Sequence, residues 1–407
     1  MAPSRASAPA HRRRLEEIVQ ASAKSTSGSC GIRVASSALS SPAAAVREAK
    51  AALGSGDFQH IIAFFGIDYD AALLARTLAE AFPGIPTSGC TTAGEIGPGG
   101  MMQGGLLLIA FPRHGFKVHT ELITDIDQFG VERATHAARR LKAKICPPDT
   151  RLDRKNVFAL LLVDGLSNAE ENIVAAIHWE IEDVDLVGGS AGDGICFDHT
   201  TMIHNGHVAR RAAILMMIES DYPFRVFKTQ NFEPTGIKLV VTAADTENRI
   251  VHELNAEPAA REYAAAIGLR PDELGPFSFA SYPLVVKVGG DYYCRSIRNM
   301  NPDGSLSFFC AIDEGLVFTV ARPRDILNAT ETTLSDVDAA LGGIDIVVGF
   351  DCVLRRLDAE SRQIRHQMDE LYKKYAVAGF HTYGEQYNAM HLNQTLTGIA
   401  FGRRVEG

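Results

Sequence analysis

Apolar residues gather in short blocks along the first part of the chain, and amphipathic stretches separate these blocks. The block 59–66 is largely apolar, as expected for a strand that is covered on both faces. Residues 71–81 then repeat apolar side chains at helical spacing until a Phe-Pro-Gly sequence ends the pattern. Further strands are predicted at 85–89 and 106–111. This alternation predicts an α/β fold for the first part of the chain.

The same order of elements recurs downstream. The matching segments are a strand at 156–163, a helix at 167–179 and strands at 185–188 and 212–218. A glycine-rich loop follows the second strand of each copy, and aligning the copies places residues 93–95 (AGE) over 191–193 (AGD). The repeated order predicts an internal duplication of a βαβ-type unit.

The pattern changes near residue 255, where a second region begins. A helix is predicted at 259–267, and the segments after it are rich in β-forming residues: 279–288, 292–298, 305–311 and 316–321. The dipeptide Asp303-Gly304 signals a hairpin among them. A helix at 323–341, a strand at 344–350, a long helix at 359–375 and a final pair of strands complete the chain.

These patterns predict three parts. We expect a disordered or extended tail at 1–35 and a duplicated α/β domain at 36–255. An α+β domain with an antiparallel sheet is expected at 256–407. The fold class is thus α/β plus α+β.

Composition is that of a soluble globular protein, with 46% hydrophobic and 22% charged residues. No apolar run is long enough to span a bilayer, and the N-terminal residues lack the apolar core of a secretory signal. The net charge of −9 argues against a nucleic-acid-binding or membrane-binding surface, because both need a positive field. The seven cysteines form no CxxC pair, which excludes zinc-ribbon, thioredoxin and c-type haem attachment signatures. Free thiols in a reducing cytoplasm fit this usage.

Two loops, GCTTAGE and GGSAGDG, combine glycines, hydroxyls and one carboxylate directly after a predicted strand. Backbone N–H groups in such loops can bind a carboxylate or phosphate, and the acid can bind an amine. Neither loop has the lysine of a phosphate-binding loop or the GxGxxG spacing, so a pair of tight structural turns is the alternative. The candidate ligand-binding residues are Gly89, Cys90, Thr91, Thr92, Glu95 and Asp193.

Two arginines, Arg355 and Arg356, follow an apolar strand in the sequence FDCVLRR. An interior ion pair between them and Glu385 explains these residues without any chemistry. Arg355 and Glu385 are nevertheless kept as further candidate ligand-binding residues.

The stretch 379–398, GFHTYGEQYNAMHLNQTLTG, is the richest in polar groups that are framed by apolar residues. Buried polar atoms without partners are costly, so such clusters hold a ligand or satisfy one another. The apolar residues on both sides predict two strands, which places the cluster at a connection at the end of a sheet. His391 is a candidate ligand, because the amides beside it could orient its ring. A hydrogen-bonded core histidine is the alternative for His391.

Three motifs of the chain, GCTTAGE, FDCVLRR and GFHTYGE, resemble those of FIST sensor proteins, and the resemblance extends from about residue 58 to 399. It implies a FIST N-like domain, a FIST C-like domain and a cytoplasmic sensor of small ligands such as amino acids. A subgroup of stand-alone nitric-oxide sensors, the NosP proteins, binds haem and regulates histidine kinases or cyclic-di-GMP enzymes. This chain is similar to that subgroup because no kinase or other signalling segment accompanies the FIST regions.

The leading hypothesis from this resemblance is a sensor that binds haem b, responds to nitric oxide and signals to a separate histidine kinase or cyclic-di-GMP enzyme. His391 is the first candidate for the axial haem ligand and for the metal ligand, and Tyr383, His381 and Tyr387 are further candidates. A homo-oligomer is compatible with this hypothesis. The alternative is a sensor of an amino acid or similar metabolite that uses the glycine loops and holds no haem. No nucleophile–base pair or paired-carboxylate motif stands out, so we do not expect an enzyme.

Overall fold

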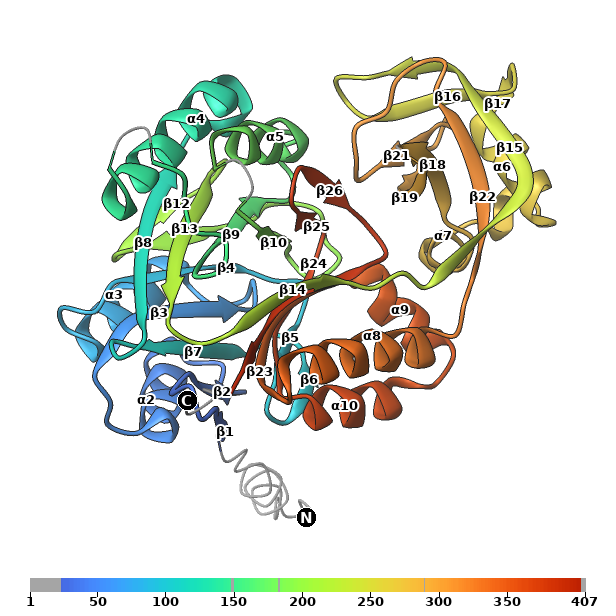
Figure 1. The fold of residues 1–407 in the computed structure, drawn as a ribbon. Helices are drawn as coiled ribbons and strands as arrows, with labels where there is room; N and C mark the ends of the chain where they lie inside the picture. The colour runs from blue at the N-terminus through green and yellow to red at the C-terminus, as the bar shows by residue number, and fades with distance from the viewer. Residues whose placement is uncertain (1–22, 148–149, 182–183, 289, 404–407) are drawn as a thin grey trace, which may run out of the picture.

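The computed structural model describes residues 23–147, 150–181, 184–288 and 290–403 (Figure 1). Of the tail predicted at 1–35, residues 1–22 lie outside the described residues. The remainder of that tail belongs to the fold, because β1 (Lys24–Ser27) pairs antiparallel with β2 (Arg33–Ser37). β2 in turn pairs with β7 (Leu106–Pro112), so it is part of a sheet.

Three copies of one β-α-β-α-β-hairpin-β unit build most of the molecule. The first runs through β2, α2 (Pro42–Leu53), β3 (Phe58–Phe65), α3 (Ala71–Ala81), β4 (Thr87–Thr91), the hairpin β5 (Glu95–Gly97) and β6 (Gly100–Met102), and β7. The second runs through β8 (Phe116–Ile123), α4 (Ile126–Ile145), β9 (Val157–Asp164), α5 (Glu170–Ile181), β10 (Leu186–Ala191), the hairpin β11 (Met202–His204) and β12 (His207–Ala209), and β13 (Ala213–Ser220).

The third copy has the same order, with its second helix split in two. It runs through β14 (Phe224–Lys228), α8 (Ile326–Leu341), β23 (Ile344–Cys352), α9 (Val353–Ser361), α10 (Arg365–Lys374), β24 (Val377–Thr382), the hairpin β25 (Glu385–Tyr387) and β26 (Met390–Leu392), and β27 (Leu396–Gly402). The predicted duplication is therefore confirmed, and the C-terminal region adds a third copy that the sequence pattern did not indicate.

Each copy forms one mixed sheet, and the hairpin of another copy completes it. The strand orders are β1-β2-β7-β3-β4-β11-β12, β8-β13-β9-β10-β25-β26 and β14-β27-β23-β24-β5-β6. The first copy gives its hairpin to the third, the second to the first and the third to the second. This cyclic exchange gives the molecule a threefold pseudo-symmetry in which no copy is complete alone.

Main-chain hydrogen bonds close a ring where the loops after β4, β10 and β24 meet. The bonds are Ala93 N to His381 O at 2.9 Å, Tyr383 N to Ser190 O at 3.1 Å and Gly192 N to Thr91 O at 3.2 Å. The ring makes Ala93 equivalent to Gly192, so the alignment of 93–95 over 191–193 is wrong by one position. A Cβ added at Gly192 would lie 3.0 Å from Ala93 N, so glycine relieves a close contact within the ring.

The inner faces of the three sheets share one apolar core, and the helices cover the outer faces (Figure 1). Alternation along β3 shows how this arises: Ile62 and Phe64 join the shared core, whereas Ala63 and Phe65 pack under α2 and α3. Phe64 also meets Phe380 of the third copy, with ring centroids 4.5 Å apart. Contacts of this kind hold the copies together.

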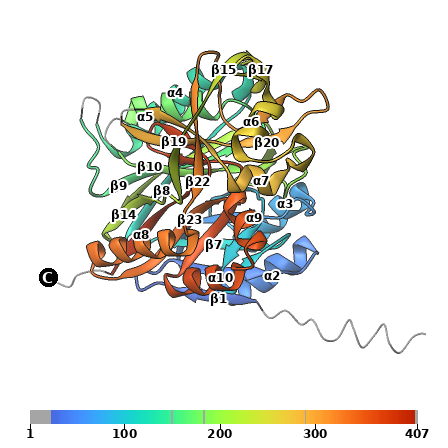
Figure 2. The same cartoon turned by 90° about the vertical axis from the view of Figure 1, so that its right-hand side faces the viewer.

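An inserted region, residues 232–323, lies between β14 and α8 of the third copy; we call it the cap. Its elements are β15 (Phe232–Asp245), β16 (Ile250–Leu254), β17 (Glu257–Pro258), α6 (Ala259–Ile267), the 3-10 helix η1 (Pro271–Glu273), α7 (Pro276–Ser281), β18 (Leu284–Val288), β19 (Asp291–Arg295), β20 (Ile297–Met300), β21 (Leu306–Phe308) and β22 (Val317–Pro323). Its antiparallel sheet encloses a separate apolar cluster. Figure 2 views the molecule from the side on which the cap lies. The cap matches the expected antiparallel character of the C-terminal part.

Two predicted elements of the C-terminal part differ from the structure. The β-rich segment 279–288 begins inside a helix, α7, which a proline at its first position favours. The long helix expected at 359–375 is divided into α9 and α10, because Gln363 adopts a left-handed φ of 59°.

Within the described ranges, no helix is both long enough and apolar enough to cross a bilayer.

Candidate functional site

The polar stretch 379–398 lies where the third copy meets the other two. It comprises β24, the hairpin β25–β26 and the start of β27, and most of its polar side chains are buried. The expected connection at a sheet end is a hairpin that pairs with β10, with Glu385 opposite Gly189. The stretch therefore delivers its side chains to the interior between copies.

A Thr-x-Gly-Glu sequence connects β4 to β5 and β24 to β25, and each copy of it ends in a buried carboxyl group. Thr92 Oγ1 donates to Glu95 Oε1 at 2.5 Å, and Thr382 Oγ1 donates to Glu385 Oε1 at 2.5 Å. Burial raises the pKa of Glu95 to about 7 and that of Glu385 to about 8, although these hydrogen bonds work in the opposite direction. Glu385 is therefore mainly protonated at neutral pH, and Glu95 titrates there.

Asp193, the acid of the second glycine loop, organises that loop. It accepts hydrogen bonds from the Tyr383 hydroxyl and from the main-chain N–H groups of residues 197–199. Burial alone would raise its pKa, but these bonds hold the pKa below its usual value. These contacts agree with the alternative that this loop is a tight structural turn, because Asp193 binds groups of the protein itself.

The other residues of the first loop also make structural contacts. A Cβ on Gly89 would lie 2.0 Å from the Ala63 carbonyl oxygen, so glycine allows β3 and β4 to approach. Burial raises the pKa of the Cys90 thiol well above its usual value, which leaves it inert. Thr91 Oγ1 accepts a hydrogen bond from the Thr201 N–H at 3.1 Å.

Arg355 pairs with Asp351 and not with Glu385, so that expectation is wrong. Arg355 Nε lies 2.5 Å from Asp351 Oδ1, and its other nitrogens donate to Asn231 at 3.0 Å and Thr330 at 2.8 Å. Asp351 precedes Arg355 by four residues, which brings the two side chains together at the start of α9. Glu385, by contrast, keeps its proton and is held by threonine hydroxyls.

Arg356 points toward the loop after β4 and forms, with Gly94, Glu95 and His381, what we call the Arg356 site. A Cβ on Gly94 would lie 2.9 Å from Arg356 Nη1 and 3.2 Å from His381 Cδ2. Arg356 Nε is 3.8 Å from Glu360 Oε1, beyond hydrogen-bond distance. Among the described residues, Arg356 Nε and both ring nitrogens of His381 find no hydrogen-bond partner. The site thus holds buried donors whose capacity is not used.

Arginine charges surround the His381 ring of the Arg356 site, although Asp351 Oδ2 also lies 3.5 Å from His381 Nδ1. Burial and then the charges of Arg356, Arg355 and Arg365 lower the pKa of His381 well below its usual value, so its ring is neutral. Burial also lowers the pKa of the Arg356 guanidinium. An anionic group placed between Arg356 and His381 would relieve the cost of both buried groups.

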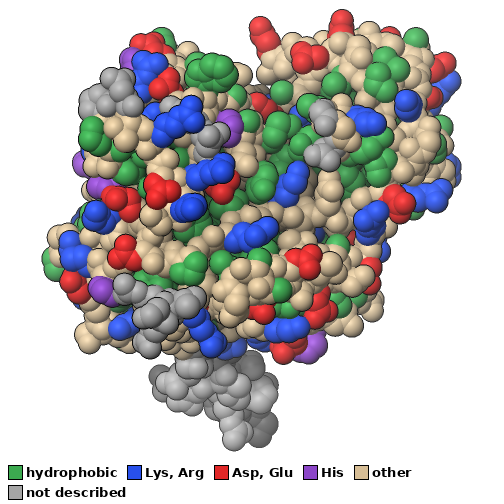
Figure 3. Space-filling view, viewed as in Figure 1, with side chains coloured by type: hydrophobic (Ala, Val, Ile, Leu, Met, Phe, Trp, Pro, Cys, Tyr) green, Lys and Arg blue, Asp and Glu red, His purple; other side chains and the backbone are tan. Residues whose placement is uncertain are grey.

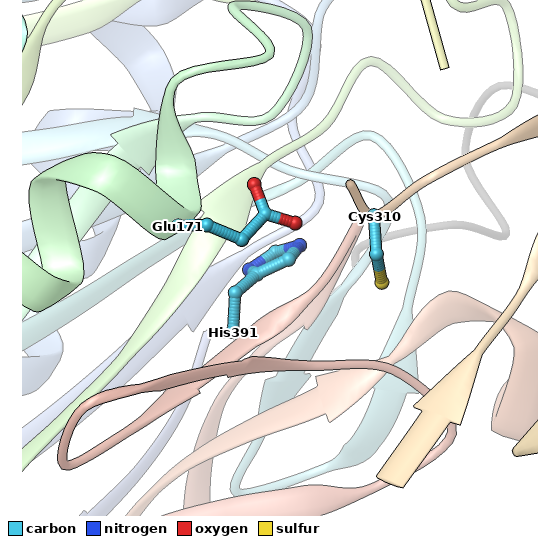
Figure 4. Close-up of side chains that lie close together, drawn as sticks. All are labelled: Glu171, Cys310 and His391. Atoms are coloured by element: carbon cyan, nitrogen blue, oxygen red, sulfur yellow. The ribbon is translucent and has the colours of Figure 1, made fainter. Parts of the chain in front are cut away.

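His391 lies at the equivalent junction between the second and third copies, where the hairpin β25–β26 packs near α5. Ligand atoms of Glu171, Cys310 and His391 all lie within 4.8 Å of one another (Figure 4). The imidazole Nδ1 is 3.2 Å from Gln386 Nε2, and Nε2 has no hydrogen-bond partner among the described residues. Burial lowers the pKa of His391 to about 4, so the ring is neutral at physiological pH.

The surroundings of His391 do not fit a haem. An axial histidine needs an open, apolar approach to its coordinating nitrogen. Here Glu171 and Cys310 crowd that approach, and even a Cβ on Gly384 would lie 2.6 Å from Nε2. Of the other proposed haem ligands, Tyr383 donates to Asp193 and His381 belongs to the Arg356 site.

Tyr387, the last haem candidate, lies apart from these groups. Its half-buried ring faces the ammonium of Lys228, 5.4 Å from the ring centroid. The predicted site residues therefore do not form one site. Some lie at the Arg356 site, others lie near His391, and Tyr387 lies outside both.

Three residues near His391 were not predicted from the sequence: Glu171, Cys310 and Arg249. Arg249, a buried cap residue, pairs with Glu170 at 2.8 Å and with Glu171 at 2.5 Å. Acidic residues in the first turn of a helix are common, so the pair Glu170-Glu171 carried no distinctive signal. Arg249 and Cys310 come from the cap, and only the fold brings them to α5.

Comparison with known proteins identifies two domain families in the chain. The FIST N domain profile matches residues 59–257, and the FIST C domain profile matches residues 259–388. An uncharacterized protein of Methanocaldococcus jannaschii is 25% identical over 296 residues, which are 70% of this chain and 51% of that protein. The chain thus spans about half the length of this relative. The border between the two matches falls inside the cap, next to β17.

Proposed function

Because the chain belongs to the FIST family, whose domains generally sense small ligands, we propose that it senses a small carboxylate-bearing metabolite at the Arg356 site. Amino acids are the first class to consider. The carboxylate would lie between Arg356 and His381, and Glu95 would face the amine.

The observation that supports this proposal is the set of unused buried donors at the Arg356 site. Buried guanidinium and imidazole groups are costly when their N–H groups lack acceptors. Among the described residues, Arg356 Nε and the ring nitrogens of His381 make no hydrogen bond, and the nearest carboxylates, those of Glu360 and Asp351, lie 3.8 and 3.5 Å away. A carboxylate supplies acceptors to both groups, and Arg–carboxylate pairing is among the strongest hydrogen-bonded contacts.

Helix α9 offers a route from the Arg356 site to the cap. Leu354 and Leu357 of the same helix pack in a cluster with Ala280 and Phe309 of the cap. Figure 3 shows hydrophobic side chains gathered along the seam between the cap and the rest of the molecule. A ligand that pulls Arg356 would shift α9 and so change the preferred position of the cap. A separate histidine kinase or cyclic-di-GMP enzyme would then distinguish the two positions.

The proposal is tested by a thermal-shift screen of the full chain against amino acids and small carboxylates. A ligand at about 100 times its Kd should stabilise the protein by about 2.7 kcal/mol, which is a shift of several degrees in Tm. In Arg356→Gln the affinity should fall about 100-fold, because the charged pair with the carboxylate is lost. Calorimetric titration of the best ligand measures this change.

Arg47→Gln is the matched control, because Arg47 is exposed on α2. It should bind the ligand as the wild type does. If no carboxylate shifts the Tm, or if Arg356→Gln binds the best ligand unchanged, the Arg356 site does not hold the ligand.

A haem-dependent nitric-oxide sensor is the second candidate, and the unpartnered Nε2 of His391 is the observation in its favour. Haem binding would require Glu171 and Cys310 to move away from the ring. The visible spectrum of protein made with ample haem tests it directly. A Soret band that shifts with nitric oxide and weakens in His391→Ala would favour haem, and a colourless protein would exclude it.

A further inference from the structure

We infer that Glu171, Cys310 and His391 form a binding site for a thiophilic divalent cation, with Zn²⁺ as the preferred ion. The bound ion would link the cap to the three repeated copies. This site is separate from the Arg356 site and does not depend on the proposed ligand. Glu171 belongs to the first turn of α5, His391 to β26, and Cys310 to the cap just after β21. The three residues thus come from three different parts of the fold.

The distances suit a tetrahedral ion after small side-chain rotations. Zn²⁺ binds nitrogen, oxygen and sulfur ligands at about 2.0–2.3 Å, which separates the ligand atoms by about 3.3–3.8 Å. In the protein these atoms already lie within 4.8 Å of one another (Figure 4). A thiolate, an imidazole and a carboxylate together favour Zn²⁺ over Mg²⁺ or Ca²⁺, which prefer oxygen ligands alone.

His391 provides the second, independent observation. Its side chain belongs to a residue only 2% exposed, yet Nε2 has no hydrogen-bond partner among the described residues. The Oε1 atom of Gln386 is unpartnered as well. If the Gln386 amide turns by 180°, its oxygen can accept from both His391 Nδ1–H and Ser190 Oγ–H. In this arrangement the proton is on Nδ1 and the lone pair of Nε2 is free to bind a metal. Metal-bound histidines commonly donate their other ring N–H to a nearby acceptor in the same way.

Cys310 is a buried thiol that now donates to Asn393 Oδ1 at 2.6 Å. Burial raises the pKa of this thiol to about 12, so the thiolate would form only when a cation binds beside it. Binding would replace the thiol proton by the metal and release that proton to solvent. Asn393 would keep its hydrogen bond from the Ser296 N–H, at 3.3 Å.

Glu171 supplies a carboxylate that is already ionised. Burial raises its pKa, but the neighbouring His391 and Arg249 and the Ala311 N–H outweigh that effect and hold the pKa below its usual value. Arg249 also pairs with Glu170, so it keeps a partner if Glu171 turns toward a metal. Three protein ligands leave a fourth position of the tetrahedron open to water.

Co²⁺ titration of the purified, chelator-treated full chain tests this inference, because Co²⁺ bound by a thiolate gives a near-ultraviolet charge-transfer band. The wild type should bind one equivalent with this band, and Zn²⁺ should displace it and raise the Tm. Cys310→Ser should lose the band and bind Zn²⁺ at least about 100-fold more weakly. Cys196→Ser is the control, since Cys196 is exposed and is not one of the three clustered ligands, and it should behave as the wild type.

The inference is overturned if the wild type shows no charge-transfer band, or if Cys310→Ser keeps the band and the affinity. A band that is lost in Cys196→Ser instead would assign the metal to a surface thiol. Should Cys310→Ser lack a cooperative unfolding transition, His391→Gln takes its place. Unchanged Zn²⁺ affinity in that variant would equally overturn the site.

Discussion

Replacing Arg355 with leucine is expected to lower the free energy of unfolding by about 3–5 kcal/mol. The guanidinium is fully buried and pairs with Asp351, whose second oxygen accepts from the Tyr372 hydroxyl at 2.8 Å. Leucine would leave the Asp351 carboxylate buried with only neutral neighbours, Tyr372 and His381, and a buried charge without its counterion is strongly destabilising. Arg355 also donates to Asn231, in the segment that leads into the cap, so the loss affects both parts.

Urea denaturation measures this effect, and Arg261→Leu is the matched control. Arg261 pairs with Glu257, four residues earlier, at 3.0 Å, and both side chains are exposed to solvent. Its replacement should cost less than about 1 kcal/mol. Equal losses in the two variants would show that the Arg355–Asp351 pair does not have the structural role given to it here. The double variant Asp351→Asn/Arg355→Leu should recover part of the stability, because no buried charge remains.

Glu385→Gln is expected to change the pH dependence of stability more than any other single substitution of a carboxyl group that we consider. Burial raises the pKa of Glu385 from 4.5 to about 8, so the folded state binds more protons than the unfolded state between these values. Stability from this group is therefore present below about pH 4.5 and is lost as the pH rises through about 8. Between pH 5 and 8 the loss is on the order of 3 kcal/mol.

Glutamine imitates the protonated form and cannot ionise. Relative to the wild type, Glu385→Gln should gain on the order of 3 kcal/mol as the pH rises from 5 to 8. Comparing the two proteins at each pH removes the contributions of other groups, including the buried His391, whose lowered pKa acts in the opposite direction. Glu80→Gln, an exposed site on α3, should follow the wild type at every pH. If Glu385→Gln also runs parallel to the wild type, Glu385 is ionised in the folded protein.

Sequence patterns predicted helices and strands well where the bounds of an element depend on its own residues and not on distant contacts. The helix at 71–81 and the helix at 259–267 were predicted with their observed bounds, because each has a clear amphipathic face and a definite end. The third copy was not predicted from the sequence, because the cap separates its first strand, β14, from its first helix, α8, by almost a hundred residues. The exchange of hairpins is invisible to periodicity for the same reason, since strand partners from different copies are far apart in sequence.

Part of the candidate site was predictable and part was not. Clustering of polar residues identified His381 and His391 as buried and chemically unusual, but it did not separate them into different junctions. Arg355 and Arg356 are neighbours on α9, and only their directions in space decide that one binds Asp351 and the other faces Gly94. The sequence around Cys310 gave no sign of a ligand, and only the fold brings this thiol close to His391.

Hydrogen–deuterium exchange of the full chain, with and without the best carboxylate ligand, tests the central claim most directly. We expect slower exchange in α9 and in the cap helix α7, because ligand bound at Arg356 would stabilise the contacts between these helices. Arg356→Gln at the same ligand concentration should show no such change. Protection of ligand-bound protein that leaves α9 and α7 unaffected would contradict a sensor that signals from the Arg356 site to the cap.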